Sequence, residues 1–154
     1  MMKRIAVFPG TFDPITVGHV DIINRSLHVF DEVIIAIGIN ASKNVMFPIE
    51  LRMQWIFNSF EKNERIKVLS YEGLTADFCR LHHAKFIIRG LRNGTDFDYE
   101  ASIARTNLEA AGIETVSFIS KPEHVAITST IVRDILRSKA DASAYLAKGV
   151  ILNS

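Results

Sequence analysis

The first group of residues able to do chemistry lies in the segment PGTFDPITVGH, residues 9–19. This segment joins an apolar run to a helical pattern. Gly10 lets the backbone approach a ligand closely because no Cβ intervenes. Thr11 adds a hydroxyl, and His19 falls in the first turn of the expected helix, where free N–H groups and the helix dipole favour a phosphate. A tight turn with a capping histidine is the structural alternative. The segment is neither a G-x-G-x-x-G motif nor a P-loop, so it predicts another kind of anion site.

Cations and hydroxyls follow other apolar runs in the same way. Lys43 lies in ASKN after the second run, and Arg89 ends the fourth run with Arg92 three residues later. Guanidinium groups suit phosphate geometry, and an arginine that emerges from a buried strand needs an anionic partner or water. Three hydroxyls at 128–130 precede the last main helix, although capping requires only one. Solvated surface charges and simple capping are the alternatives. Together these groups predict an anionic ligand.

Alternating strands and helices must position these groups. Five runs rich in Ile, Val and Phe predict strands, and continuous apolar runs are typical of strands buried on both faces of a parallel sheet. The expected strands span 4–8, 32–39, 65–71, 85–90 and 115–120, and helical patterns span 17–30, 48–60, 75–84, 96–112 and 129–140. This order predicts a Rossmann-like α/β fold, with a five-stranded parallel sheet and helices on both faces. Every candidate polar group then falls at the carboxyl edge of the sheet, where such folds bind ligands.

Length and composition exclude several classes of protein. The 154 residues fit a single domain over 1–154, with 48% hydrophobic and 23% charged residues, as in globular proteins. A net charge of +1 argues against a nucleic-acid partner. Cys79 is the only cysteine, which rules out an internal disulfide and a multi-cysteine zinc site, and we expect it in the core. No apolar run reaches the roughly 18 residues of a membrane span, so we expect a soluble, cytoplasmic protein.

Two motifs resemble those of a known family. GTFDPITVGH resembles the T-x-G-H version of the H-x-G-H motif of the nucleotidyltransferase superfamily, and ITSTIVR at 127–133 resembles its I-S-S-T-x-x-R motif. With SKNVMF, IRGLR and DFDYE between them in order, the chain resembles the bacterial phosphopantetheine adenylyltransferase family from residue 3 to about residue 146. The resemblance implies that ATP and 4′-phosphopantetheine react to give dephospho-coenzyme A and pyrophosphate. It also implies Mg²⁺ carried by ATP, coenzyme A as a feedback ligand, and a homohexamer; no metal-ligand spacing appears in the chain.

The resemblance also assigns roles to residues. It places His19, Thr11, Lys43 and Arg92 at the reacting phosphates, with His19 as the transition-state stabiliser. The residues expected to bind ATP are Thr11, Phe12, His19, Gly90, Leu91, Arg92, Glu100, His124, Val125, Ala126, Ile127, Thr128, Ser129 and Thr130. Those expected to bind phosphopantetheine are Thr11, Lys43, Leu74, Thr75 and Arg89. A helix N-cap is the alternative role for Thr75, and a surface acid is the alternative for Glu100.

Three rival functions stay open at this point. Another nucleotidyltransferase could use CTP or a different phosphorylated acceptor, although Thr16, Arg89 and the three hydroxyls favour the phosphopantetheine branch. A non-catalytic sensor of ATP or coenzyme A could keep the fold, but it has less need of His19. A generic NAD-binding domain is the weakest rival because its glycine motif is missing.

Overall fold

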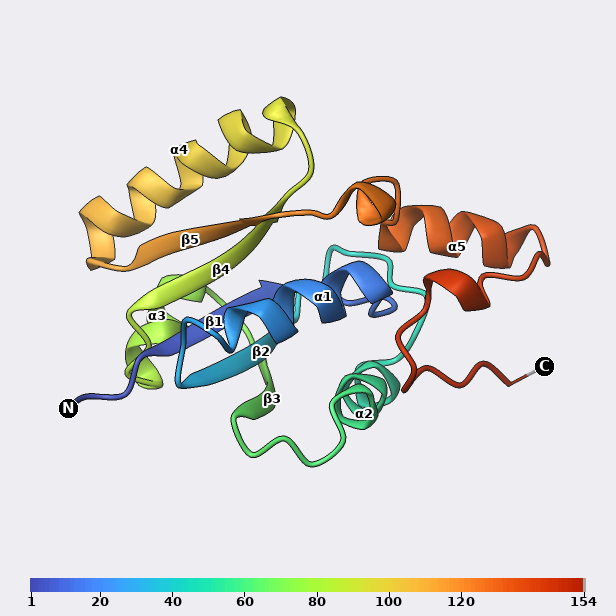
Figure 1. The fold of residues 1–154 in the computed structure, drawn as a ribbon, viewed down its shortest axis with the longest axis horizontal. Coiled ribbons are helices and arrows are strands. Elements are labelled where there is room, and N and C mark those ends of the chain that lie inside the picture. Colours follow the sequence, from blue (N-terminus) through green and yellow to red (C-terminus); the bar gives the residue numbers. More distant parts are fainter. Residues whose placement is uncertain (154) are drawn as a thin grey trace.

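Strands and helices alternate along the chain in the computed structural model, which describes residues 1–153 (Figure 1). Each expected strand and helix is present within about two residues at most ends, and the helices expected at 17–30, 75–84 and 129–140 end three or four residues earlier. The elements are β1 Ile5–Gly10, α1 Val17–Ser26, β2 Glu32–Gly38, α2 Ile49–Ser59, β3 Ile66–Tyr71, α3 Thr75–Leu81, β4 Phe86–Leu91, α4 Gly94–Ala111, β5 Glu114–Ile119 and α5 Ser129–Arg137, with 3-10 turns at Pro122–His124 and Ser143–Tyr145.

The five strands form one parallel sheet in the order β3-β2-β1-β4-β5. The chain builds outward from β1 through β2 to β3, then returns to the other side of β1 with β4 and β5. The strand order therefore reverses between β1 and β4, which is the place where doubly wound folds bind ligands. The predicted fold class is confirmed.

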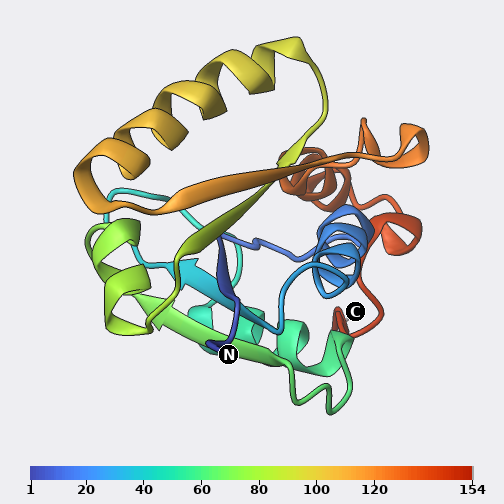
Figure 2. The same cartoon turned by 60° about the vertical axis from the view of Figure 1, so that its left-hand side comes forward.

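Helices cover both faces of the sheet, as Figures 1 and 2 show from two directions. On one face, alternate residues of β1 and β2 such as Phe8 and Ile35 pack against Ile23 of α1 and Trp55 of α2. On the other face, Val7, Ile34, Ala36 and Ile87 pack against Phe78 and Cys79 of α3 and against Ile113 at the end of α4. Because both faces of the central strands are buried, β1 and β2 read as continuous apolar runs in the sequence.

The sheet opens between β1 and β4 at its carboxyl edge. Within residues 1–153, these two strands are in register at only two positions, Ala6 with Phe86 and Val7 with Ile87, whereas β1 and β2 are in register at six. Pro9 also lies in β1 and has no N–H to donate. The backbone from Phe8 onward is therefore free of its β4 neighbour, and space for a ligand opens between the strands.

Caps fix the helix ends that border this space. Thr16 caps α1 through a capping box with His19, Asn93 caps α4, and Thr128 caps α5. Gly112 ends α4 with a φ of 65°, as the sequence predicted. The alternative role of Thr75 as an N-cap is wrong. Helix α3 begins at Thr75 itself, which makes no capping bond and instead pairs its hydroxyl with the Tyr71 hydroxyl at 2.7 Å.

The chain after α5 returns to pack beside α1 and α2. The Ala147 amide donates to the Ile15 carbonyl at 3.3 Å, and the Gly149 amide donates to Ser59 Oγ at 3.1 Å. A Cβ at residue 149 would collide with the backbone of α2 at Ser59 and Trp55, so only glycine fits there. In residues 1–153, no helix has both the length and the apolar character needed to cross a membrane.

Candidate active site

Three cavities meet where the sheet opens. The α4 cavity, of about 330 Å³, lies between the ends of β1, β2 and β4 and the side of α4. The α1 cavity, of about 270 Å³, lies between the end of β1, α1 and the loop before α5. The α5 cavity, of about 430 Å³, lies between Thr11, Lys43 and the start of α5. Arg89 lines the first two, His19 lines the last two, and Thr11 and Lys43 line the first and third. Of the four predicted catalytic groups, His19, Thr11 and Lys43 thus stand at junctions between cavities, whereas Arg92 lines the α1 cavity alone.

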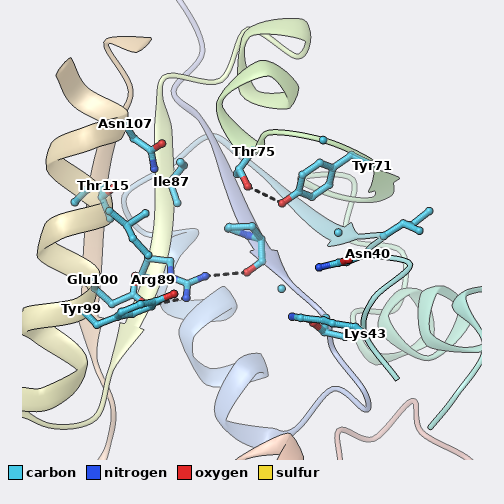
Figure 3. Close-up of a pocket in the computed structure, with 18 residues that line it drawn as sticks. Asn40, Lys43, Tyr71, Thr75, Ile87, Arg89, Tyr99, Glu100, Asn107 and Thr115 are labelled. Carbon is cyan, nitrogen blue, oxygen red and sulfur yellow. Dashed lines mark hydrogen bonds and ion pairs between the residues drawn. The ribbon is translucent and has the colours of Figure 1, made fainter. Parts of the chain in front are cut away.

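The α4 cavity combines an apolar wall with cations at one end. Figure 3 shows Arg89 and Lys43 pointing toward the same space from opposite sides, with Tyr71 and Thr75 farther along. Ile87 contributes to the apolar wall of this cavity. A ligand with a phosphate at one end and a less polar arm fits this distribution of groups.

Arg89 is held by a carboxylate behind it. Its Nε and Nη2 donate to the two carboxylate oxygens of Glu100 at 2.8 and 2.7 Å, and its Nη1 donates to the Pro9 carbonyl at 3.3 Å (Figure 3). Glu100 is 9% exposed and lines the α4 cavity. The two-point bond fixes the plane of the guanidinium while leaving its cavity side open. The structure therefore pairs Glu100 with Arg89, although the resemblance assigned Glu100 to ATP.

His19 is fixed in one tautomer by the chain before it. The Thr16 amide donates to His19 Nδ1 at 3.0 Å, and an amide can only donate, so Nδ1 must carry the lone pair. The neutral ring then carries its proton on Nε2. The rings of Phe12 and Phe8 meet the imidazole edge-on, with centroids 5.0 and 6.2 Å away. His19 thus presents one fixed N–H donor to the α1 and α5 cavities.

The imidazole is also kept neutral. Burial, followed by the positive charges of Arg89 and Arg92, lowers the pKa of His19 from 6.5 to about 4. A neutral imidazole can donate a hydrogen bond to a phosphate oxygen. With the lowered pKa, the charge of the ring does not change near neutral pH. The sequence left a capping role and a ligand-facing role for His19 as alternatives, and the two are compatible because they would use different ring nitrogens.

Cations and hydroxyls line the α5 cavity. Lys43 Nζ donates to Thr11 Oγ1 at 3.0 Å. Arg133 reaches from α5 to the Asp13 carbonyl at 2.9 Å and to Thr130 Oγ1 at 3.2 Å. Two positive side chains therefore flank a space that has Thr11 and His19 on its other wall.

The other predicted cation and hydroxyls have protein partners as well. Arg92 donates through Nε and Nη2 to Asp96 at 3.0 and 3.2 Å, and this pairing is the main reason that the pKa of Asp96 is lowered. Thr128 Oγ1 caps α5 by accepting from the Ile131 amide at 3.1 Å, and Ser129 Oγ donates to the Pro14 carbonyl at 2.8 Å. Capping thus explains Thr128, and Ser129 ties α5 to the loop after β1.

His124 lies in the wall of the α1 cavity beside an acid. Its Nδ1 is buried without a hydrogen-bond partner and lies 3.9 Å from Asp21 Oδ2. Asp21 is already paired with Lys121 at 2.9 Å and Arg25 at 3.0 Å. The pair with Lys121 fastens the segment before α5 to α1, whereas the pair with Arg25 lies within α1.

The structure gathers most of the predicted residues but not all of them. Those lining the α1 cavity are Phe12, His19, Gly90, Arg92, His124, Ile127, Thr128 and Ser129; Thr130 lines the α5 cavity; Thr11, Lys43, Thr75, Arg89 and Glu100 line the α4 cavity. Leu91 lines a small groove under α4, Val125 and Ala126 are exposed beside the α1 cavity lining, and Leu74 is 70% exposed outside all of these linings.

Sequence reasoning missed several residues that line the cavities. Arg133 closes the quoted ITSTIVR motif, and that position could have marked it. Ile22 in the α1 cavity, and Asn107 and Tyr99 in the α4 cavity, lie on helix faces that become visible only once the helices are placed. Tyr99 stands in the quoted DFDYE segment without having been singled out, and no pattern in the sequence marked Ile22 or Asn107.

Comparison with known proteins identifies the family. The family model described as cytidylyltransferase-like matches residues 7–135. A phosphopantetheine adenylyltransferase of Bacteroides thetaiotaomicron is 48% identical, over 97% of this chain and 99% of its own length. One of Flavobacterium johnsoniae is 49% identical over 87% of this chain and 88% of its own length. The chain belongs to the phosphopantetheine adenylyltransferase family.

A more distant solved structure has the same fold. The bifunctional NMN adenylyltransferase/ADP ribose pyrophosphatase of Francisella tularensis superposes with a TM-score of 0.75 at 18% identity, covering 97% of this chain and 46% of its own. At this identity the likeness concerns the fold alone. This chain therefore spans about half of that larger protein.

Proposed function

We propose that the chain transfers the adenylyl group of ATP to 4′-phosphopantetheine, giving dephospho-coenzyme A and pyrophosphate in coenzyme A biosynthesis. Family membership supports the reaction. The observation that carries it is the meeting of two cavities at Arg89, with His19 on one side and Lys43 on the other. A reaction between two phosphates needs two anion sites that share a boundary.

The cavities suit the two substrates differently. We assign phosphopantetheine to the α4 cavity, where Arg89 and Lys43 receive its phosphate and the pantetheine arm runs toward Tyr71 and Thr75. We assign the nucleoside of ATP to the α1 cavity, beside Gly90 and the loop at 124–129. The triphosphate then passes His19 into the α5 cavity.

The chemistry requires alignment rather than a protein nucleophile. An oxygen of the acceptor phosphate attacks the α-phosphorus of ATP, the bond from that phosphorus to the bridging oxygen breaks, and the electron pair leaves with pyrophosphate. His19 Nε2–H donates to an α-phosphoryl oxygen, where negative charge builds up in the transition state. Lys43 and Thr11 hold the attacking phosphate, and Arg92 contacts ATP after exchanging part of its bond with Asp96. No general base is needed because the acceptor phosphate is already ionised.

We also propose that Mg²⁺ arrives with ATP. In residues 1–153, no cluster of three His, Cys, Asp or Glu side chains could hold a metal ion. Asp13 is the acid in the α5 cavity, and both of its carboxylate oxygens accept backbone N–H groups. The ion would therefore be held by phosphate oxygens and water, and when bound it offsets charge on the β- and γ-phosphates.

We propose a cytoplasmic homohexamer as the working form. Intracellular ATP supports the location, and exposed apolar side chains of α4 support association, including Phe97 at 55% exposed and Leu108 at 45%. Sedimentation of a stable monomer at assay concentration would contradict this assembly.

Pyrophosphate release with ATP and Mg²⁺ tests the proposed function, with acceptors compared side by side. We expect release with 4′-phosphopantetheine and none with unphosphorylated pantetheine, nicotinamide mononucleotide, glycerol phosphate or choline phosphate. Turnover with a different acceptor would support nucleotidyl transfer but would refute 4′-phosphopantetheine as the acceptor. ATP binding without turnover of any acceptor would favour a sensor, whereas in an enzyme His19→Ala should keep ligand binding and lose most turnover.

A further inference from the structure

The loop that carries Lys43 has little packing of its own. Residues 39–45 join β2 to α2 and are exposed throughout. Among residues 1–153, the Lys43 ammonium has one hydrogen-bond partner, Thr11 Oγ1 at 3.0 Å. An exposed loop with few buried contacts opens readily, so it does not by itself hold an ammonium in place for a reaction. The Lys43 amide donates to the Asn40 carbonyl at 3.0 Å, so residues 40–43 form a turn of their own, and the place of this turn relative to Thr11 depends on where the loop rejoins the core.

The buried carboxylate of Asp13 binds the loop where it rejoins the core. Asp13 is 2% exposed, and its two oxygens accept the amides of Met46 and Phe47 at 2.8 and 2.9 Å. The carboxylate belongs to the segment after β1, which also carries Thr11. Two charge-assisted hydrogen bonds therefore join the segment of Thr11 to the loop of Lys43, three residues beyond the lysine.

A buried guanidinium makes the same connection from the opposite side. Arg52 of α2 is 5% exposed and donates through Nη1 to the Thr11 carbonyl at 2.7 Å and through Nε to the Phe47 carbonyl at 2.9 Å. Asp13 and Arg52 thus supply four hydrogen bonds between residues 11–13 and 46–47. Arg133 also donates to the Asp13 carbonyl at 2.9 Å, which attaches α5 to the same segment.

We propose that Asp13, supported by Arg52, is a positioning residue that sets the reach of Lys43 across to Thr11 and the acceptor phosphate. This inference rests on the proposed function. Both carboxylate oxygens of Asp13 accept backbone amides, and Oδ2 also lies 3.9 Å from Arg133 Nη1, so the carboxylate is tied to the protein through each oxygen. Its effect on the reaction passes through the backbone of residues 46–47 to Lys43.

A double-mutant cycle between Asp13 and Lys43 tests this role. Asp13→Asn keeps the shape but leaves only one acceptor oxygen for two amides. We expect it to lower kcat/KM by about 100-fold, because misplacement of about 1 Å costs that much. In the Lys43→Ala background we expect Asp13→Asn to add less than about 3-fold, since the group it positions is gone. Equal losses in both backgrounds would overturn the inference.

A matched control separates positioning from general destabilisation. Glu32 is also a buried acid, 5% exposed and paired with Lys67 at 2.8 Å and Lys3 at 3.3 Å, but it lies at the start of β2 away from the cavities. Glu32→Gln should keep kcat/KM within about 2-fold, as expected for a polar change far from the site. A loss with Glu32→Gln as large as that with Asp13→Asn would refute a specific role for Asp13.

Hydrogen exchange gives a readout that needs no turnover. We expect the amides of Met46 and Phe47 to exchange at least about 10-fold faster in Asp13→Asn while the β1 amides stay protected, because only the local bonds are lost. Unchanged exchange at 46–47 would overturn the inference even if activity fell. If Asp13→Asn does not fold, Arg52→Met replaces it in the double-mutant cycle, since methionine has no donor for the Thr11 and Phe47 carbonyls. A wild-type chain that turns over no acceptor would refute the proposed function, and exchange alone would then decide whether Asp13 holds the loop.

Discussion

The charge state of His19 is the property on which the proposed transition-state contact depends most directly. The ring is predicted to stay neutral, with its proton on Nε2, from neutral pH down to about pH 5, because its pKa is lowered to about 4. The cause is burial, reinforced by Arg89 and Arg92. Acidification from pH 7 to pH 5 is therefore the perturbation, and His19→Gln is the control that removes the titrating group while keeping a polar side chain.

The expected size follows from the shift in pKa. In the unfolded chain His19 takes up a proton near pH 6.5, whereas in the folded chain it does so near pH 4. Its contribution to the free energy of unfolding is therefore complete above pH 6.5 and is lost as the pH falls toward 4. The full loss is at most about 3 kcal/mol, and about 2 kcal/mol of it falls between pH 7 and pH 5. These are upper values, because the ring keeps some contact with solvent.

Two measurements check this prediction. Urea unfolding at pH 7 and pH 5 should show a loss of stability in the wild type that exceeds the loss in His19→Gln by up to about 2 kcal/mol. The other four histidines are common to both chains and cancel. Long-range ¹H–¹⁵N correlation should show the proton on Nε2 and a titration midpoint near 4. A midpoint at or above 6.5, or a proton on Nδ1, would refute the reasoning.

Three further predictions concern single positions. Lys43→Ala should lower kcat/KM for phosphopantetheine by about 100-fold or more in a pyrophosphate-release assay, whereas the exposed Lys85→Ala should not; equal losses would contradict the assignment. Gly149→Ala should lower the free energy of unfolding by about 1–3 kcal/mol in urea titrations, because its Cβ would meet the α2 backbone; an unchanged midpoint would argue against that contact. Cys79 should react with a thiol reagent at pH 8 only after unfolding, since burial raises its pKa to about 11; fast labelling of the folded chain would show it to be accessible.

Much of the fold was predictable because the central strands are buried on both faces. That burial produces continuous apolar runs, such as the one at 32–38 that forms β2. The end of each run marks where the chain leaves the core. The polar residues that follow each run then fall at one edge of the sheet. The positions of His19, Lys43 and Arg89 at the cavities follow from this rule together with the family motifs.

The roles of helix-borne residues were less predictable, because a periodic pattern does not say which neighbour a side chain meets. Glu100 reads as a surface acid or a ligand contact, whereas the structure sets it against Arg89. Thr75 has the residue type of a cap, but its hydroxyl pairs with Tyr71 because the end of β3 brings that phenol close. Asp13 and Arg52 escaped notice because their partners are backbone groups more than thirty residues away along the chain.

The opening of the sheet between β1 and β4 allows a bound substrate to connect the ends of the two strands. Near their starts the two strands are paired in the parallel sheet. Toward their ends, the hydrogen bond from Arg89 to the Pro9 carbonyl connects them. A ligand that contacts residues 8–11 and 89–92 together adds a temporary cross-link at the end where the ladder is missing. If substrates bind across this opening as proposed, the ends of β1 and β4 are held together only while the substrates are bound, so we expect hydrogen exchange at these ends to slow with substrates and to recover after product release.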